Sequence, residues 1–338
     1  MINMKVINDI EEYKDILKKE IDNNNLVIFP TETVYGIGAN ALESDAVNKI
    51  FEVKTRAKNN PLIVHLKSVN EISKYAIIEN DIEQKLIDTF MPGPITIILK
   101  KKDCIPECVT AGLDTVGIRV PINEIANRFL NIVDVPIAAP SANISSRPSG
   151  TKVSDIKSEF DDKVNYIIDG GESKIGLEST VVKVINNVPT ILRPGYITKE
   201  MIEKVVGSCN VSSHVLKEVD INSKVESPGM LYRHYAPNTK CLLIYSKDIN
   251  LLKKEIIKHL TNKTIILGSN NLKDINCYKF INYGDDLETI SHNLFSYLRL
   301  CDSYKADLII IEGVDKVGLG LAIMNRLIRT SNFNYIEL

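Results

Sequence analysis

The sequence lacks any long apolar run, and its first 20 residues are charged throughout. A helix that crosses a bilayer needs about 20 predominantly apolar residues, so no membrane segment is expected. A secretory signal peptide needs a continuous apolar core near the N-terminus, and none is present there. These absences predict a cytoplasmic protein with no membrane contact.

An excess of positive charge is also lacking. The 41 Lys and Arg residues are balanced by 43 Asp and Glu residues, for a net charge of −2. A large nucleic-acid footprint normally appears as a basic excess, so the composition does not indicate one. A local basic cleft is still compatible with these numbers.

Closely spaced metal ligands are scarce. Of six cysteines only Cys104 and Cys108 lie near one another, and the five histidines do not cluster. A zinc site requires two close pairs of ligands. We therefore predict reduced thiols and no protein-built metal site.

The length of 338 residues predicts two domains. Alternating elements fill the C-terminal third: strands 241–245, 264–267, 278–281 and 307–311 with helices 248–260, 286–300 and 319–330. This alternation predicts an α/β fold with a small, mostly parallel sheet. We expect a first domain over 1–206, a linker over 207–238 and a second domain over 239–338.

A strand predicted at Leu26–Phe29 runs into an unusual loop. Pro30 ends the strand because proline has no N–H to donate. Four hydrogen-bonding side chains and two glycines follow: Thr31, Glu32, Thr33, Tyr35, Gly36 and Gly38. Such loops form ligand sites beyond the carboxyl ends of strands in α/β proteins. A Thr-rich turn between a strand and a helix explains the same residues.

Cations gather after the next predicted helix. Residues 54–61, KTRAKNNP, precede a strand at 62–66 that contains His65. The basic loop can complement a helix dipole or hold phosphate or carboxylate. Arg119 lies in the middle of a strand at 116–121, where its burial requires a partner, such as an anionic ligand.

A second hydroxyl-rich loop, residues 141–151, follows a short strand at 136–140, and Arg193 ends a hairpin at 181–192. The first 206 residues contain no Ser-His-Asp set and no paired carboxylates in one motif. Hydroxyl loops with Lys54, Arg56, Arg119 and Arg193 suit a polyanion beside a small polar molecule. This composition favours catalysis by positioning and charge neutralisation, as in nucleotidyl transfer.

Seven motifs occur in this order: FPTETVYGIGANA, KTRAKNNPLIVHL, MPGPITIIL, GIRVP, APSANISSRPSGT, GLESTVV and ILRPG. Together they resemble the YrdC-like family of threonylcarbamoyl-AMP synthases. SPGMLYRHYAP and GLGLAIMNRL resemble the long form of that family, which adds a linker and a C-terminal domain. Two positions depart from the family pattern: Ala57, where proline is usual, and Ser146, where glycine is usual. Both departures concern loop shape.

The resemblance implies a YrdC-like twisted mixed sheet with helices around an open cleft, and a smaller Rossmann-like domain. It implies that L-threonine, bicarbonate and ATP give threonylcarbamoyl-AMP, pyrophosphate and water. Mg²⁺ would accompany ATP, held largely by phosphates and water. The product would serve a separate tRNA threonylcarbamoyl transferase machinery that modifies adenosine-37, whereas direct contact with tRNA is not implied.

The resemblance also implies roles for individual residues. The threonine side comprises Thr33, His65, Arg119, Ser179 and the backbone of Ala139. The nucleotide side comprises Arg56, Asn60, Thr115, Ser141, Ser149, Arg193 and, from the linker, Tyr232. Lys54 and Arg56 are the catalytic candidates near the phosphates, and Thr31, Tyr35 and Asn143 are second contacts.

Three alternatives remain open at this point. An RNA-binding module without catalysis would bind RNA in a salt-dependent way without threonine. A carbamoyl transferase of the related hydrogenase-maturation type would need acylphosphatase-like and zinc-finger segments, and the cysteine spacing excludes the latter. The third alternative is a binding protein that has lost its activity.

Overall fold

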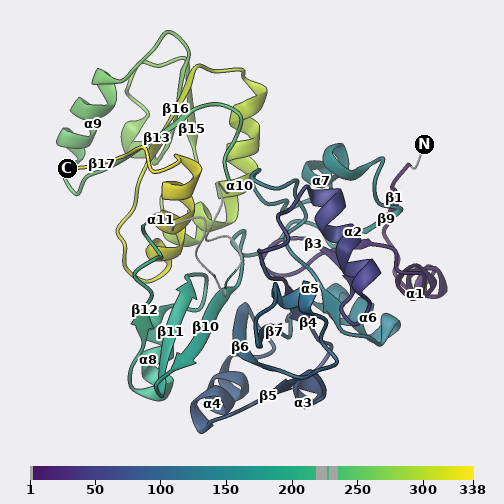
Figure 1. Ribbon diagram of the computed structural model, residues 1–338. Helices are drawn as coiled ribbons and strands as arrows, with labels where there is room; N and C mark the ends of the chain where they lie inside the picture. Colours follow the sequence, from purple (N-terminus) through teal and green to yellow (C-terminus); the bar gives the residue numbers. More distant parts are fainter. Residues whose placement is uncertain (1–2, 218–226, 228–234) are drawn as a thin grey trace.

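The computed structural model describes residues 3–217, 227 and 235–338. Its strands form two separate sheets, one built by β1–β12 and the other by β13–β17. Figure 1 shows the sheets as two lobes, with α10 and α11 between them. The predicted α/β class is confirmed, whereas the domain boundaries at 206 and 238 stay predictions.

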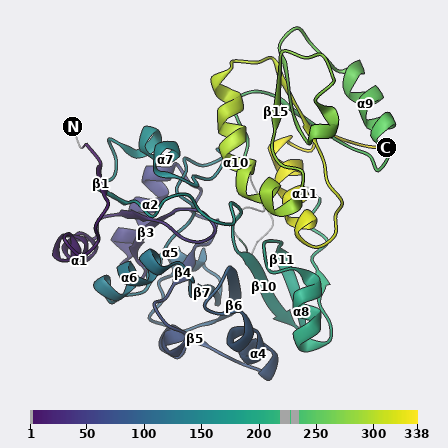
Figure 2. The same cartoon turned by 180° about the vertical axis from the view of Figure 1, so that it is seen from behind.

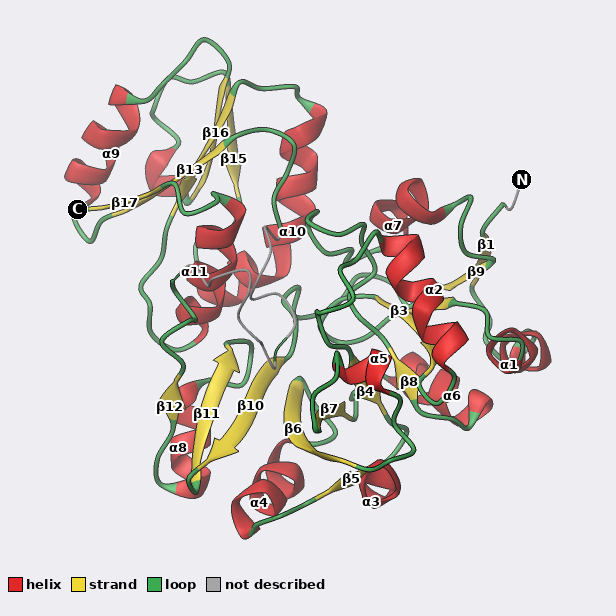
Figure 3. Ribbon diagram, in the orientation of Figure 1, coloured by secondary structure: helices red, strands yellow, loops and turns green. Residues whose placement is uncertain are grey.

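The large sheet mixes parallel and antiparallel pairs, as expected. Its order is β1-β9-β2-β3-β8-β4-β7-β6-β10-β11-β12, and β5 pairs with β6. The strands are β1 (Lys5–Ile7), β2 (Val27–Phe29), β3 (Gly36–Asn40), β4 (Ile63–His65), β5 (Ala76–Ile77), β6 (Ile95–Lys101), β7 (Thr115–Arg119), β8 (Ile137–Ala138), β9 (Tyr166–Ile168), β10 (Thr180–Ile185), β11 (Val188–Arg193) and β12 (Asn210–Val211). Figure 3 shows this sheet running from β12 on the left to β9 and β1 on the right.

Helices surround this sheet. They are α1 (Lys14–Asp22), α2 (Ser44–Lys54), α3 (Ile72–Tyr75), α4 (Asp81–Phe90), α5 (Glu107–Thr110), α6 (Glu124–Val133), α7 (Val153–Phe160) and α8 (Lys199–Val206), with a 3₁₀ turn at Val69–Glu71. Asn80, Asn123 and Thr198 each accept a hydrogen bond from a backbone N–H of the first turn that follows. These caps explain why α4, α6 and α8 begin where they do.

The small sheet is wholly parallel, in the order β15-β14-β16-β13-β17. Its elements are β13 (Cys241–Tyr245), α9 (Ile249–Lys258), β14 (Thr264–Gly268), a 3₁₀ turn (Asn270–Leu272), β15 (Lys279–Asn282), α10 (Leu287–Ser303), β16 (Leu308–Glu312), α11 (Leu319–Thr330) and β17 (Tyr335–Glu337). Figures 1 and 2 show α10 and α11 on the side facing the first lobe, and α9 on the far side.

The segment after Pro30 differs from expectation, because Gly36–Asn40 forms strand β3, antiparallel to β2. Its glycines permit close packing. A Cβ atom at Gly38 would lie 2.7 Å from Ile137 Cγ2 and 2.9 Å from Phe29 Cε1. Glycine is therefore required here by neighbouring side chains in the sheet.

The two lobes share an apolar contact. Val34 and Leu177 of the first lobe belong to the same buried cluster as Leu294, Phe295 and Leu298 of α10. Burial of these side chains stabilises the contact between lobes. Across the described ranges, none of the helices has both the length and the apolar character needed to cross a membrane.

Candidate active site

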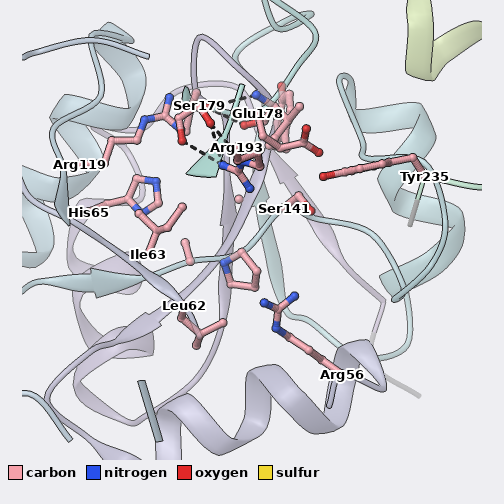
Figure 4. A pocket seen from close by; sticks show the side chains of 16 residues that line it. Arg56, Leu62, Ile63, His65, Arg119, Ser141, Glu178, Ser179, Arg193 and Tyr235 are labelled. Carbon is pink, nitrogen blue, oxygen red and sulfur yellow. Dashed lines mark hydrogen bonds between the residues drawn. The ribbon is translucent and has the colours of Figure 1, made fainter. Parts of the chain in front are cut away.

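A pocket of about 580 Å³, open at its mouth, lies where the loops of the first lobe meet Tyr235. Seven predicted site residues line it: Arg56, His65, Arg119, Ala139, Ser141, Ser179 and Arg193. Of the three expected second contacts, Thr31 and Tyr35 also line it, whereas Asn143 does not. Figure 4 shows Arg119 and His65 on one side, with Arg56 and Tyr235 on the other.

Arg119 at the end of β7 has a protein partner. Its Nη2 donates to Glu32 Oε1 at 2.7 Å, and both side chains are almost fully buried. Among the described atoms, neither Arg119 Nε nor Glu32 Oε2 has a hydrogen-bond partner. The sequence predicted that a buried Arg119 needs a partner, and Glu32 is a partner for one of its guanidinium nitrogens. The remaining groups can still bind a polar ligand.

His65 on β4 pairs in register with Arg119 on β7. Burial, followed by the positive charge of Arg119, lowers the pKa of His65 to about 3. Its Nδ1 has no hydrogen-bond partner among the described atoms. His65 is therefore neutral near pH 7, with one nitrogen ready to donate to or accept from a ligand.

Arg193 at the end of β11 holds the start of β10. Its Nε and Nη2 donate to the Ser179 carbonyl oxygen at 3.1 and 2.9 Å, and Nη2 donates to Ser179 Oγ at 3.1 Å. Burial lowers the pKa of Arg193 to about 10, which leaves it charged near pH 7. Ser179 Oγ also bonds Thr96 Oγ1 at 2.8 Å. This network fixes a positive charge in the pocket wall.

Arg56 follows shortly after α2, which ends at Lys54, and the intervening Thr55 adopts a left-handed conformation. The Arg56 guanidinium donates to the carbonyl oxygens of Asn60 and Pro61 at 3.0–3.4 Å. Asn60 is buried, and no described atom bonds its Oδ1. A smaller adjoining pocket of about 260 Å³ is lined by Thr115. Asn60 and Thr115 thus lie close to the main pocket without lining it.

Lys54 does not line the pocket. Its Nζ donates to the carbonyl oxygens of Ser141 and Asn143, and burial lowers its pKa well below the usual range. Asn143 in turn accepts a hydrogen bond from Ser141 Oγ at 2.6 Å. Lys54 therefore holds the second hydroxyl loop in place, and its catalytic role stays a prediction.

Thr33 and Ser149 lie behind the pocket wall. Thr33 Oγ1 bonds Thr31 Oγ1 at 2.8 Å, and Ser149 Oγ donates to Glu178 Oε1 at 2.6 Å. Both residues are fully buried. In this structure they orient residues that line the pocket, and direct contact with a ligand stays a prediction for each.

Two polar residues that line the pocket, Glu178 and Tyr235, were not among the predicted site residues. Glu178 lies within the quoted GLESTVV motif, and Tyr235 within SPGMLYRHYAP. The Tyr235 ring stacks on Phe295 of α10 at 5.2 Å. Tyr232, the predicted linker contact, lies outside the described residues.

These features define an α/β protein whose pocket is lined at one end by Arg119, which is paired with the buried Glu32, and at the other by Arg56. A family model described as telomere recombination (Sua5_yciO_yrdC) matches residues 19–195. A model described as the threonylcarbamoyl-AMP synthase C-terminal domain (Sua5_C) matches residues 197–331. The chain belongs to the threonylcarbamoyl-AMP synthase family, which confirms the resemblance seen in its sequence.

Individual relatives are similar along nearly the whole chain. A threonylcarbamoyl-AMP synthase of Pyrococcus abyssi is 42% identical, covering 97% of each chain. One from Bacillus subtilis is 39% identical, covering 93% of this chain and 91% of the relative. The crystal structure of P. abyssi Sua5 complexed with L-threonine superposes with a TM-score of 0.92 at 39% identity, covering 99% of this chain and 100% of that one.

Proposed function

We propose that the chain is a threonylcarbamoyl-AMP synthase that joins L-threonine, bicarbonate and ATP and releases pyrophosphate. One observation carries the proposal: His65 Nδ1, Arg119 Nε and Asn60 Oδ1 are buried in or beside one pocket without partners among the described atoms. Buried polar groups are normally hydrogen-bonded, so such groups mark where a polar ligand binds. The product would pass to a separate machinery that modifies adenosine-37 of tRNA.

Threonine fits the side that contains His65 and Arg119. Its carboxylate would accept from the Arg119 guanidinium, which is suited to planar anions. The hydroxyl and amine would find partners among His65, Thr31 and Ser179. A site built from fixed polar groups rejects analogues that lack those groups, because its buried atoms would then stay unpaired.

The nucleotide fits the side that contains Arg56, Ser141 and Arg193. The threonine amine attacks bicarbonate to give a carbamate and water, and the carbamate oxygen then attacks the α-phosphorus of ATP and displaces pyrophosphate. Holding the reactants together lowers the activation free energy by on the order of 7–11 kcal/mol at best. Arg56 and Arg193 would offset the charge that builds on the phosphates.

Mg²⁺ fits this site only as a companion of the triphosphate. Among the described residues there is no group of three or more His, Cys, Asp or Glu side chains suited to hold a metal ion. Mg²⁺ keeps several waters and binds readily to phosphate oxygens. Its contribution would be to neutralise phosphate charge, while Ser141 and the arginines position the nucleotide.

The RNA-binding alternative is disfavoured by where the cations of the basic loop lie. Lys54 is buried with its ammonium on two carbonyl oxygens, and Arg56 lines the pocket. Only Lys58 of the three is exposed. A loop that directs two of its three cations inward offers little charge to an RNA backbone.

The activity is tested by following pyrophosphate release from ATP and bicarbonate with and without threonine. We expect release to depend on threonine, and release that ignores threonine would overturn the proposal. Tight, salt-dependent RNA binding without any turnover would instead support the binding-module alternative.

The Arg56→Ala and Arg193→Ala variants test the nucleotide side. Each should lower turnover by about 100-fold or more, because each removes a charge aimed at the phosphates. Lys58→Ala is the matched control, since it removes an exposed cation from the same loop. Wild-type rates in both arginine variants would mean that the nucleotide side is misplaced.

A further inference from the structure

Helix α11 of the second lobe carries a buried charge to the back of the pocket. Arg326 is fully buried, and its Nε donates to Glu178 Oε2 at 2.8 Å across the boundary between lobes. Glu178 itself lines the pocket. A buried ion pair stays favourable only when both partners are present and well bonded, so each side chain depends on the other.

The Glu178 carboxylate links this arginine to the second hydroxyl loop. Its Oε2 accepts a hydrogen bond from Arg326 Nε, and its Oε1 accepts one from Ser149 Oγ at 2.6 Å. Burial alone would raise the pKa of Glu178, but Arg326, Arg193 and Ser149 together lower it. Glu178 is therefore ionised near pH 7, and both of its oxygens have fixed partners.

Two further residues at the pocket wall, Pro194 and Tyr235, contact the same guanidinium. Arg326 Nη1 donates to the Pro194 carbonyl oxygen at 2.9 Å, directly after Arg193. The Arg326 guanidinium also lies 5.5 Å from the centre of the Tyr235 ring. Arg193 and Tyr235 both line the pocket. One side chain of the second lobe thus contacts the Glu178, Arg193–Pro194 and Tyr235 walls.

We propose that Arg326 is a positioning residue, through which the second lobe sets the shape of the nucleotide side of the active site. This inference rests on the proposed function. The contacts given by the described residues join Arg326 to Glu178, Pro194, Asn325 and Tyr235, and none joins it directly to His65, Arg119 or Ser179 of the threonine side. Replacing Arg326 should therefore raise the KM for ATP more than the KM for threonine. A contact that only stabilises the fold would not produce this difference.

The test compares Arg326→Met and Arg326→Lys with His292→Ala in the full-length chain. His292 is a matched control because it also joins the lobes, bonding the Lys174 carbonyl oxygen from α10, and it does not line the pocket. Arg326→Lys keeps the charge but loses the fork that reaches both Glu178 and Pro194. It remains informative if Arg326→Met fails to fold.

The measurements are the KM values for ATP and threonine from pyrophosphate release, with ATP binding by calorimetry as a second readout. We expect both Arg326 variants to raise the KM for ATP at least tenfold, with the KM for threonine changed less than twofold and His292→Ala close to wild type. Equal effects on both substrates, or Arg326 variants that match His292→Ala, would overturn the inference. Wild-type protein without threonine-dependent release would overturn the proposed function instead.

Discussion

At the residue scale, His65 shows how burial sets the protonation state of a side chain that lines the pocket. The side chain is buried beside Arg119, and its pKa falls from 6.5 to about 3. In the unfolded chain the same imidazole takes up a proton below about pH 6.5. Between these two values the unfolded state binds one more proton at this site than the folded state.

This difference predicts a pH dependence of stability. The free energy of unfolding should rise with pH between about 3 and 6.5 and level off above that window. Replacing His65 by Gln should remove up to about 2.5 kcal/mol of the difference between pH 4.5 and pH 7.5. Urea unfolding at both pH values measures it.

The matched control is His259→Gln, since His259 lies on the surface beside Glu255 and does not line the pocket. The change in the free energy of unfolding between the two pH values is compared between each variant and wild type. This comparison removes the contribution of the other titrating groups. Identical pH dependence in wild type and His65→Gln would show that His65 is not held neutral by the fold.

At the scale of elements, the second hydroxyl loop contains a strained residue. Ser146, at the position where the family usually has glycine, adopts a left-handed backbone with φ of 77°. Its carbonyl oxygen accepts from the Ala236 N–H at 2.9 Å, which ties this loop to the chain beside Tyr235. The departure noted in the sequence thus falls on a position that favours glycine for a physical reason.

Ser146→Gly should stabilise the protein slightly. Relief of the left-handed strain should raise the free energy of unfolding by about 1–2 kcal/mol. The extra freedom of glycine in the unfolded chain should lower it by about 0.5–1 kcal/mol. A net gain near 0.5 kcal/mol would appear as a small rise in Tm by calorimetry. A lower Tm would mean that the Ser146 hydroxyl makes a stabilising contact.

Strand β3 gives a prediction of opposite sign. Gly38→Ala would place a Cβ 2.7 Å from Ile137 Cγ2, too close without movement of β8. Overpacking of this kind lowers the free energy of unfolding by about 1–3 kcal/mol, which urea unfolding can measure. Gly36→Ala is the control, since its nearest contact would be 3.3 Å, and it should cost less. Equal losses would contradict the packing explanation.

The same elements show what the sequence can and cannot predict. Helix 319–330 was predicted from local pattern and is observed as Leu319–Thr330. Strand β3 was missed because glycines carry no strand preference, and its packing partner Ile137 lies about a hundred residues away. The motifs indicated Arg119, but not its ion pair with Glu32, 87 residues distant. Contacts of this kind depend on the assembled fold.

At the scale of the whole molecule, Tyr235 lines the pocket and the second lobe supports the pocket wall through Arg326. Deleting residues 227–338 removes Tyr235 from the wall and leaves Glu178 without Arg326. We expect ATP to bind at least tenfold more weakly, as measured by calorimetry. The truncated chain also exposes Val34 and Leu177, so its folding should be checked by circular dichroism. Unchanged ATP affinity would mean that the second lobe is only tethered.

The pairing of Glu178 with Arg326 also has a consequence for synthesis of the chain. The two residues are separated by 148 positions, and translation proceeds at about 5–20 residues per second, so Arg326 is made roughly 7–30 s after Glu178. During that interval the carboxylate has no guanidinium to bury against. A nascent chain, or one that terminates before α11, therefore leaves the buried Glu178 carboxylate without its Arg326 partner.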